Sequence, residues 1–316
     1  MPTVWTNVVL SASEEAWLCE KIAPYDLVID ASGVNNLTAG AGDPRAQEAE
    51  ILFGQPAVED LLNSTTKKWM HITSAGYTRY DTSEILSHLK DSGTAFTNSS
   101  SVYDSPCAEH ALAFILAHNR RLAPSLNAKT WTYTELRPQT RILECQTVLI
   151  VGYGAIGERL AELLQPFRCT VRGLRREPRG NERTPCYRIS ELKEQLGWAD
   201  HVVNILPLNA STELIFGEKE FKAMKPGATF TNIGRGDTVD QTALLNALNK
   251  DLAAALLDVV SPEPLPEGHP LWTAPNCWIT PHIAGGLQNE AQTLLDHFVE
   301  NFRLYQAKDK LVDRIV

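Results

Sequence analysis

The 316-residue sequence lacks the features that mark several large classes of protein. None of its apolar runs approaches the roughly 20 residues that cross a bilayer, and its first residues carry neither the basic region nor the apolar core of a secretion signal. Positive charge is not in excess, because 29 Lys and Arg against 38 Asp and Glu give a net charge of −9. A chain of this charge repels nucleic acid and anionic lipid. We therefore expect a cytoplasmic protein with neither a nucleic-acid nor a membrane partner.

Cysteine is sparse and forms no recognisable pattern. The six cysteines are scattered, without Cys-x-x-Cys spacing and without histidines at ligand spacing. Such residues are typical of small core side chains in a reducing compartment, not of a disulfide framework or a metal centre. The sequence therefore predicts no metal site.

Apolar residues make up 43% of the chain, enough for two domains of ordinary size. Short strand-like runs alternate with helical segments over residues 1–102, and a second such series begins at residue 147. This alternation predicts α/β domains with parallel sheets. A long helix is expected over Pro106–Arg121, and Ser190 and Asp240 are expected to cap later helices. A capping box at Ser11 and a last helix with the apolar face Leu294, Leu295, Phe298 and Phe302 complete the pattern.

The most informative stretch is a glycine motif that follows the strand-like run 147–151. Gly152 allows a tight turn, Gly154 leaves room for a pyrophosphate, and Gly157 lets the following helix pack closely on its strand. A strand before the motif and a helix after it distinguish it from an ordinary glycine-rich turn. The motif predicts a dinucleotide-binding enzyme.

Two arginines close the next strand, where a fold that prefers NAD carries an acidic residue. Arg175 and Arg176 offer planar guanidinium groups that match the 2′-phosphate of NADP. A solvated basic turn is the alternative interpretation. We expect NADP(H) to be preferred, with NAD(H) still possible.

Polar residues follow three later strands, at the edge where open parallel sheets bind ligands. Arg235 follows the first of these strands, Asp258 and Glu263 follow the second, and His282 follows the third. Each alone has an ordinary structural explanation. Together they place an anion binder, an acid and a proton donor beside the dinucleotide site.

The chain resembles the D-isomer-specific 2-hydroxyacid dehydrogenases over nearly its whole length. The matching stretches are 68–81, 107–112, the glycine motif, 206–212, 232–236, 257–264 and 280–286. The resemblance implies two Rossmann-like or flavodoxin-like parallel-sheet domains with a cleft between them. The substrate domain would comprise 1–102 and 286–316, and the dinucleotide domain 103–285. It also implies a homodimer, to which the helix 106–121 and the stretch 131–136 could contribute.

The resemblance further implies a role for each site residue. Arg235, Glu263 and His282 would be catalytic, and Arg235 would also bind the substrate, with backbone N–H groups near Ala75, Gly76 and Tyr77 holding the substrate carboxylate. Asp258 and the Ile233 carbonyl would meet the nicotinamide carboxamide. The expected cofactor residues are Gly152, Gly154, Ala155, Ile156, Gly157, Arg175, Arg176, Pro207, Thr212, Ile233, Asp258 and Gly285.

Departures from the family pattern bear on substrate and cofactor. Arg175 matches the branch that reduces glyoxylate and hydroxypyruvate with NADPH, Gly234 replaces a more usual Ala or Ser, and Tyr77 replaces a small aliphatic residue. The expected reaction is reversible reduction of a small 2-oxo acid to the D-2-hydroxy acid. Two alternatives stay open: a catalytically weak dinucleotide-sensing scaffold, like the related corepressors, and a methyltransferase. The latter leaves Arg175 and Arg176 without a purpose.

Overall fold

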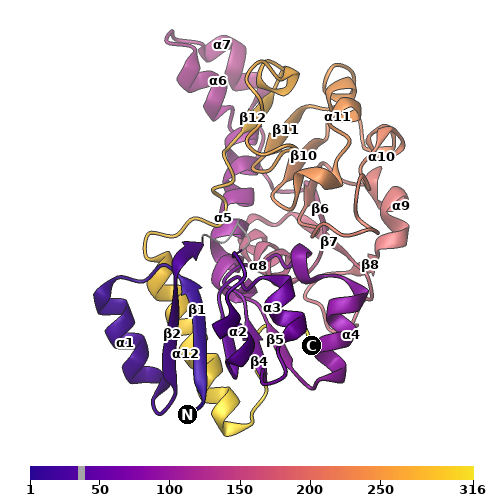
Figure 1. The fold of residues 1–316 in the computed structure, drawn as a ribbon. Helices are drawn as coiled ribbons and strands as arrows, with labels where there is room; N and C mark the ends of the chain where they lie inside the picture. The colour runs from indigo at the N-terminus through magenta and orange to yellow at the C-terminus, as the bar shows by residue number, and fades with distance from the viewer. Residues whose placement is uncertain (35–39) are drawn as a thin grey trace. The chain divides into compact units, whose positions relative to one another are not determined.

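The computed structural model describes residues 1–34 and 40–316 and divides into two compact units. Unit 1 comprises Met1–Tyr103 and Leu287–Val316, and unit 2 comprises Asp104–Gly286. Each unit has one parallel sheet flanked by helices (Figure 1). The predicted fold class, two parallel-sheet α/β domains, is confirmed. Among the described residues, no helix is both long enough and apolar enough to span a bilayer.

Unit 1 is built on a five-stranded sheet in the order β2-β1-β3-β4-β5. Its strands are β1 (Thr3–Val8), β2 (Asp26–Val34), β3 (Ile51–Phe53), β4 (Trp69–His71) and β5 (Ala95–Thr97). Its helices are α1 (Ala12–Ile22), α2 (Pro44–Glu48), α3 (Val58–Asn63), α4 (Ser83–Asp91), α12 (Glu290–Ala307) and the short 3-10 turn η1 (Thr78–Tyr80). The predicted capping box at Ser11 is confirmed.

The alternation of side chains along these strands separates two hydrophobic layers. Val4 and Phe53 pack with α1 and α12, where Phe298 stacks on Phe53 with ring centres 4.0 Å apart. Trp5 and Leu52 face the other side and pack with α2, α3 and α4. Helix α12 therefore covers one face of the sheet that the N-terminal strands form.

Unit 2 contains a seven-stranded sheet in the order β12-β11-β10-β9-β6-β7-β8. The strands are β6 (Thr147–Val151), β7 (Thr170–Arg175), β8 (Cys186–Arg188), β9 (His201–Asn204), β10 (Thr229–Asn232), β11 (Ala254–Leu257) and β12 (Cys277–Ile279). The helices are α5 (Ser100–Asn119, which crosses the unit boundary), α6 (Leu122–Asn127), α7 (Tyr133–Leu136), α8 (Ala155–Leu164), α9 (Leu192–Leu196), α10 (Glu218–Ala223) and α11 (Gln241–Leu248). Short 3-10 turns are η2 (Arg137–Gln139), η3 (Gln165–Phe167), η4 (Ile189–Glu191), η5 (Gly236–Thr238) and η6 (Pro270–Trp272).

The order of strands reverses at β6, which lies between β7 and β9. Every pairing in this sheet is parallel, so all carboxyl ends meet at one edge. Ligands of open α/β sheets bind at such a reversal. The fold thus places the glycine turn after β6 at the expected position for a bound nucleotide.

Two local predictions are wrong. Helix α5 begins at Ser100, so Pro106 lies inside it. The start is fixed by side chains outside the helix, since Asn98 and Asp313 accept the backbone N–H groups of Ser100 and Ser101. Ser190 is no N-cap, because it lies within η4. The cap at Asp240 is confirmed, with N–H groups of Thr242 and Ala243 donating to its carboxylate.

Candidate active site

The glycine turn between β6 and α8 has the geometry that each glycine was predicted to provide. Gly152 has a φ of 99°, and a Cβ there would lie 2.8 Å from the Ile205 carbonyl carbon. A Cβ on Gly157 would lie 3.0 Å from the Ile150 side chain, so helix and strand are in close contact. A Cβ on Gly154 would meet nothing within 4 Å. Ala155 and Ile156 form the first turn of α8, so its N-terminal amides lie beside this open side of the turn.

The two arginines at the end of β7 differ in their surroundings. Arg175 is mostly buried and its Nη1 lies 3.3 Å from the Glu182 carboxylate. The backbone N–H groups of Arg179 and Gly180 donate to the same carboxylate at 2.6 and 2.8 Å. These bonds, that from Arg179 foremost, lower the pKa of Glu182. Arg176 is exposed and has no ion pair with any residue that the structure describes.

The turn after β9 holds the next two predicted cofactor residues. The Thr212 hydroxyl donates to the Pro207 carbonyl at 2.6 Å and accepts the Asn209 N–H at 2.9 Å. Thr212 is buried, whereas Pro207 is exposed. Thr212 therefore fixes the turn, and Pro207 is the member that a ligand could contact.

Asparagine side chains shape the exit from β10. Asn232 accepts the Gly234 N–H at 3.0 Å and donates to the Arg235 carbonyl at 3.1 Å. A Cβ on Gly234 would lie 2.6 Å from the Leu206 carbonyl oxygen, which explains why the usual Ala or Ser is absent here. Ile233 is buried in the same segment. The Ile233 carbonyl, which is predicted to contact the cofactor, lies in the backbone segment that the Asn232 hydrogen bonds hold in place.

Asp258, directly after β11, holds the loop that carries His282. Its carboxylate accepts the hydroxyl of Thr280 at 2.6 Å and the N–H groups of Ile283 and Ala284, each at 2.9 Å. The His282 N–H donates to the Asp258 carbonyl at 2.9 Å. Gly285 lies in the turn that these bonds stabilise. Asp258, a predicted cofactor residue, therefore has a structural role in this loop.

The imidazole of His282 contacts Glu263 directly. Nδ1 lies 2.7 Å from Glu263 Oε2, and Oε1 of the same carboxylate accepts the Val260 N–H at 3.0 Å. Partial burial opposes ionisation of Glu263, but these two bonds and the positive charges of His282 and Arg235 outweigh it and lower the pKa of the carboxyl. An ionised Glu263 orients the ring and leaves Nε2 for a proton transfer.

Arg235 completes this group of residues. Burial lowers the pKa of its guanidinium, and the nearby Glu263 carboxylate acts in the opposite sense. Its Nη1 donates to the Gly234 carbonyl at 2.6 Å, which leaves other N–H groups of the fork for a ligand. Arg235, Glu263 and His282 therefore lie together at the carboxyl edge of the unit 2 sheet.

The predicted substrate residues other than Arg235 lie in unit 1, in the segment after β4. Asn98 donates to the Ala75 carbonyl at 2.6 Å, and Ser74 donates to the Gly76 carbonyl at 2.7 Å. The Tyr77 ring packs edge-on against Phe96, with centres 5.9 Å apart. Because the carbonyls point to these partners, the turn has a fixed shape at the carboxyl edge of its sheet.

Several residues that organise the site were missed from the sequence. No sequence pattern relates Glu182 to Arg175. Asn98 and Ala75 are separated in the sequence by a helix, so their contact could not be predicted either. His110 lies in the stretch 107–112 that we singled out, and its Nε2 is 3.1 Å from Thr280 Oγ1. Only this last residue had a sequence signal.

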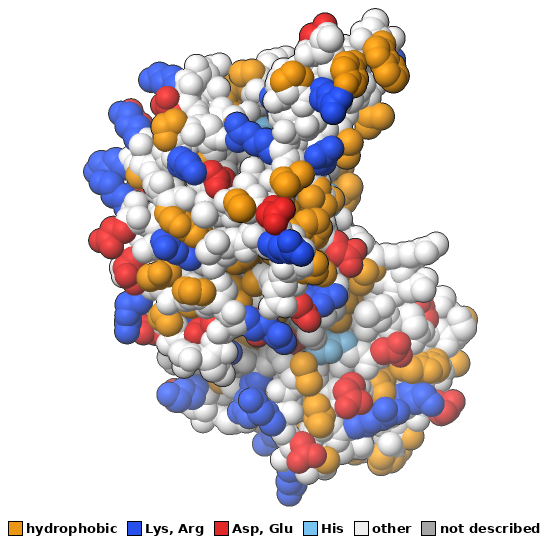
Figure 2. Space-filling view, turned by 180° about the vertical axis from the view of Figure 1, so that it is seen from behind, with side chains coloured by type: hydrophobic (Ala, Val, Ile, Leu, Met, Phe, Trp, Pro, Cys, Tyr) orange, Lys and Arg blue, Asp and Glu red, His pale blue; other side chains and the backbone are white. Residues whose placement is uncertain are grey.

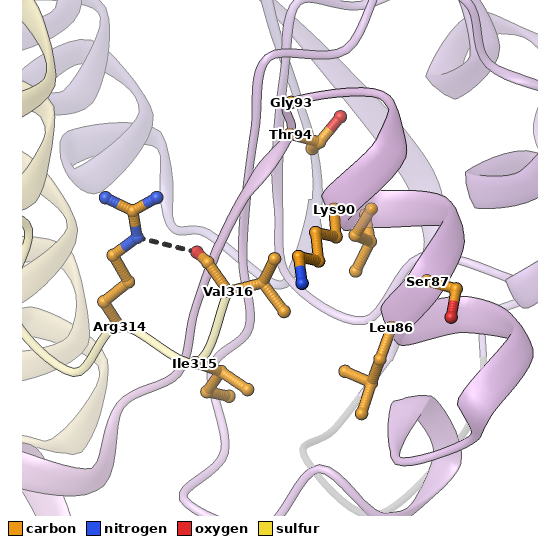
Figure 3. A pocket seen from close by; sticks show the side chains of 9 residues that line it. Leu86, Ser87, Lys90, Gly93, Thr94, Arg314, Ile315 and Val316 are labelled. Atoms are coloured by element: carbon orange, nitrogen blue, oxygen red, sulfur yellow. Dashed lines mark hydrogen bonds between the residues drawn. The ribbon is translucent and has the colours of Figure 1, made fainter.

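A cavity elsewhere in unit 1 holds none of the predicted site residues. It measures about 520 Å³ and lies between α4 and the C-terminal segment, where Arg314 Nε donates to the Val316 carbonyl (Figure 3). Its lining side chains come from Leu86, Ser87, Leu89, Lys90, Gly93, Thr94, Arg314, Ile315 and Val316. This cavity therefore does not mark the candidate active site, which is identified by the contacts among its side chains.

Comparison with known proteins identifies relatives of this chain. The model of the D-isomer specific 2-hydroxyacid dehydrogenase NAD-binding domain matches residues 112–284. Glyoxylate/hydroxypyruvate reductase B of Escherichia fergusonii is 32% identical over 285 residues, which cover 85% of this chain and 86% of that protein. Glyoxylate reductase/hydroxypyruvate reductase of Homo sapiens is 35% identical over 218 residues, 66% of each chain.

A solved structure has the same fold over the whole chain. It is a D-isomer specific 2-hydroxyacid dehydrogenase from Xanthobacter autotrophicus Py2 in complex with NADPH and MES. It is 25% identical, with a TM-score of 0.81, and the match covers 100% of this chain and 98% of that one.

Proposed function

The chain belongs to the D-isomer specific 2-hydroxyacid dehydrogenase family, and we propose that it transfers a hydride reversibly between a nicotinamide cofactor and C2 of a small 2-oxo acid. The observation that carries this proposal is the 2.7 Å contact between His282 and Glu263, with Arg235 beside them. The product of reduction is the D-2-hydroxy acid. Glyoxylate and hydroxypyruvate are the first candidates, since the two curated relatives are named for them.

His282 is the general acid of reduction. Glu263 accepts the Nδ1–H and its negative charge stabilises the imidazolium, so that Nε2 can donate a proton to the carbonyl oxygen of the substrate. In the reverse direction the neutral ring removes that proton. Arg235 binds the carboxylate of the substrate and offsets the charge that develops on the carbonyl oxygen as the hydride arrives.

The cofactor binds at the glycine turn of unit 2, and this assignment is supported by the match of the NAD-binding domain to residues 112–284. The bound cofactor supplies the hydride. The N-terminal turn of α8, with Ala155 and Ile156, offers backbone amides to the pyrophosphate beside Gly154. Asp258 and the Ile233 carbonyl hold the carboxamide, and Pro207 and Gly285 line the site, with Thr212 fixing the turn that carries Pro207. We assign cofactor binding to residues 103–285.

NADPH is the preferred reductant in this proposal. Arg176 is exposed and unpaired among the described residues, so its guanidinium is free to bind a 2′-phosphate. Arg175 is held by Glu182 and adds positive potential at the same strand end. The relative from Xanthobacter autotrophicus binds NADPH, which supports this preference. NADH remains a usable, weaker reductant.

We assign substrate binding to residues 1–102 and 286–316, which correspond to unit 1 to within one residue at each boundary. Asn98 and Ser74 donate to the carbonyls of Ala75 and Gly76, so these carbonyls face away from an anion, and we assign the backbone N–H groups of the turn at Ala75, Gly76 and Tyr77 to the substrate carboxylate. Backbone N–H groups in a rigid turn bind carboxylates well.

A homodimer is part of the proposal. Helices α6 and α7 lie in a segment of unit 2 that carries an apolar surface, visible where orange side chains gather on its outer part (Figure 2). The exposed residues there are Leu122, Leu126, Trp131, Tyr133 and Ile142, and Trp131 is 92% exposed. A monomer seldom exposes so large a group of apolar side chains, so a second copy is its expected cover.

Oxidation of NADPH and of NADH, followed over a panel of 2-oxo acids, tests the function directly. We expect turnover of glyoxylate or hydroxypyruvate, faster with NADPH, and a loss of about 10² to 10⁴ in rate for His282→Ala. Full turnover by that variant on every acid would refute the assigned acid. Nucleotide-dependent association without turnover would instead support a dinucleotide-sensing scaffold.

A further inference from the structure

One cationic side chain of unit 1 has no role in the mechanism above. Arg79 lies in the short turn η1, four residues after Ala75, and is half-buried. Its Nη1 is 3.3 Å from the side-chain oxygen of Gln55, and its guanidinium carbon is 5.8 Å from the centre of the Tyr80 ring. Both contacts are with groups that carry no negative charge.

Gln55 links Arg79 to the turn that binds the substrate carboxylate in the proposed function. It is buried, two residues beyond the end of β3. Its amide nitrogen lies 3.2 Å from the hydroxyl of Thr73 and 3.1 Å from that of Ser74. One side-chain amide therefore spans the gap between Ser74 and the guanidinium, which places these groups at most about 9 Å apart.

The charge of Arg79 lacks a counter-charge. No carboxylate lies within ion-pair distance of it in the part of the chain that the structure describes, whereas Arg45 and Arg303 of the same unit each have one. A guanidinium partly withdrawn from water is stabilised when an anion binds to it. Its position near the carboxyl ends of β3 and β4 is where open parallel sheets accept ligands.

Resting on the proposed function, we propose that Arg79 binds a second anionic group on the C2 substituent, so that the protein prefers 2-oxo dicarboxylates over 2-oxo monocarboxylates. A four-carbon diacid with a hydrogen bond at each end spans about 9 Å, which is comparable to the upper limit on the separation of Ser74, the residue before the Ala75–Gly76 turn, and the Arg79 guanidinium. Glyoxylate and hydroxypyruvate can bind at the turn, but they leave the guanidinium unpaired.

Binding of D-malate and D-lactate to the NADPH complex of the full chain tests this directly. Both acids are already reduced, so neither reacts with NADPH, and calorimetry reports affinity alone. We expect D-malate to bind about ten-fold more tightly than D-lactate or better, as a charge-assisted hydrogen bond provides. Arg79→Gln should remove most of that ratio. Arg303→Gln, an exposed arginine on α12, is the matched control and should preserve the ratio.

Equal affinities for the two acids in the unmodified protein, or a malate preference that survives Arg79→Gln, would overturn the inference. Arg79 would then be a solvated side chain packed on Tyr80. The failure of the proposed function has a different signature, which is the absence of NADPH oxidation with any 2-oxo acid. Glyoxylate reduction with no malate preference would therefore refute the second anion site and leave the dehydrogenase assignment intact.

Discussion

His282 adopts a backbone conformation that is unfavourable for its residue type, and neighbouring hydrogen bonds hold it there. Its φ of 53° lies in the left-handed region, which a histidine seldom adopts. The Asp258 carbonyl accepts its N–H, and the Asp258 carboxylate accepts the next two N–H groups. The backbone geometry of His282 is therefore determined by Asp258, which lies 24 positions earlier in the chain.

Replacing Glu263 by glutamine keeps a hydrogen-bond acceptor beside His282 but removes the negative charge. The imidazolium then loses its stabilising partner, so reduction should lose activity on the alkaline side of its pH profile. We expect that limb to move about one pH unit towards acid, with a lower kcat at neutral pH. Initial rates of NADPH oxidation from pH 5 to 9 measure this.

Glu267→Gln is the matched control for that charge, because Glu267 lies on the same loop but forms no ion pair with any residue that the structure describes. An unshifted profile for Glu263→Gln would contradict the assigned role. The folded protein has the lower Glu263 pKa, so the ionised pair contributes stability at neutral pH. That contribution disappears as the pH falls through and below the ordinary range of a glutamate. At such pH the unmodified protein and Glu263→Gln should unfold at more similar temperatures.

At the residue scale, the sequence indicated the candidate site residues but not the side chains that hold them in place. Arg235, Glu263 and His282 were recognisable because each follows a strand and because the family pattern marks them. Glu182 and Asn98 were not, since their roles depend on tertiary contacts that no spacing rule encodes. Gly234 was noted as a departure, and its reason, the Leu206 carbonyl 2.6 Å from a Cβ, needs coordinates.

At the scale of elements, our proposal assigns cofactor choice to the loop between β7 and β8. Glu182 fixes it by accepting two backbone N–H groups and the Arg175 guanidinium. Arg176→Ser removes the free cation without adding charge, and the ratio of kcat/KM for NADPH to that for NADH should fall at least about ten-fold. Steady-state kinetics with both cofactors give the ratio.

Arg168→Ser is the control for this loop, since Arg168 is highly exposed and lies before β7. A ratio that stays constant in Arg176→Ser and also in Arg175→Ser would rule out the proposed NADPH preference. Aspartate is a poor choice at position 175 in this experiment, because Glu182 would repel it.

Element boundaries show where sequence patterns stop being informative. The strand before the glycine motif was predicted at its observed bounds, because a continuous apolar run identifies a buried parallel strand. Strand β8 was not predicted, as its three residues are only partly buried and give no period. The start of α5 was placed too late because Pro106 resembles a first-turn proline, whereas the helix is capped from Asp313.

At the scale of the whole molecule, the exposed apolar surface on α6 and α7 predicts self-association. Trp131→Glu places a charge in that surface and should weaken the dimer by at least about ten-fold. Light scattering after size-exclusion chromatography should give twice 35.0 kDa for the unmodified protein and a lower mass for the variant. Trp272→Glu, at an exposed tryptophan elsewhere in unit 2, should remain dimeric.

A mass of 35.0 kDa for the unmodified protein at micromolar concentration would refute the dimer. The two-unit organisation itself could be read from the sequence, because two series of strands and helices flank the glycine motif. The structure of the stretch 124–145 could not be predicted from the sequence. Helices α6 and α7 are short and their residues are largely exposed, so no buried face gives them a periodic apolar pattern.

The stacking of Phe298 on Phe53 has a consequence for synthesis on the ribosome. The five-stranded sheet is translated early, but α12, which covers one of its faces, emerges last. Unit 2 is contiguous, so it can be completed while the N-terminal strands still await their cover. A released fragment of residues 1–286 should therefore resist protease over 104–286 and remain cleavable over 1–103.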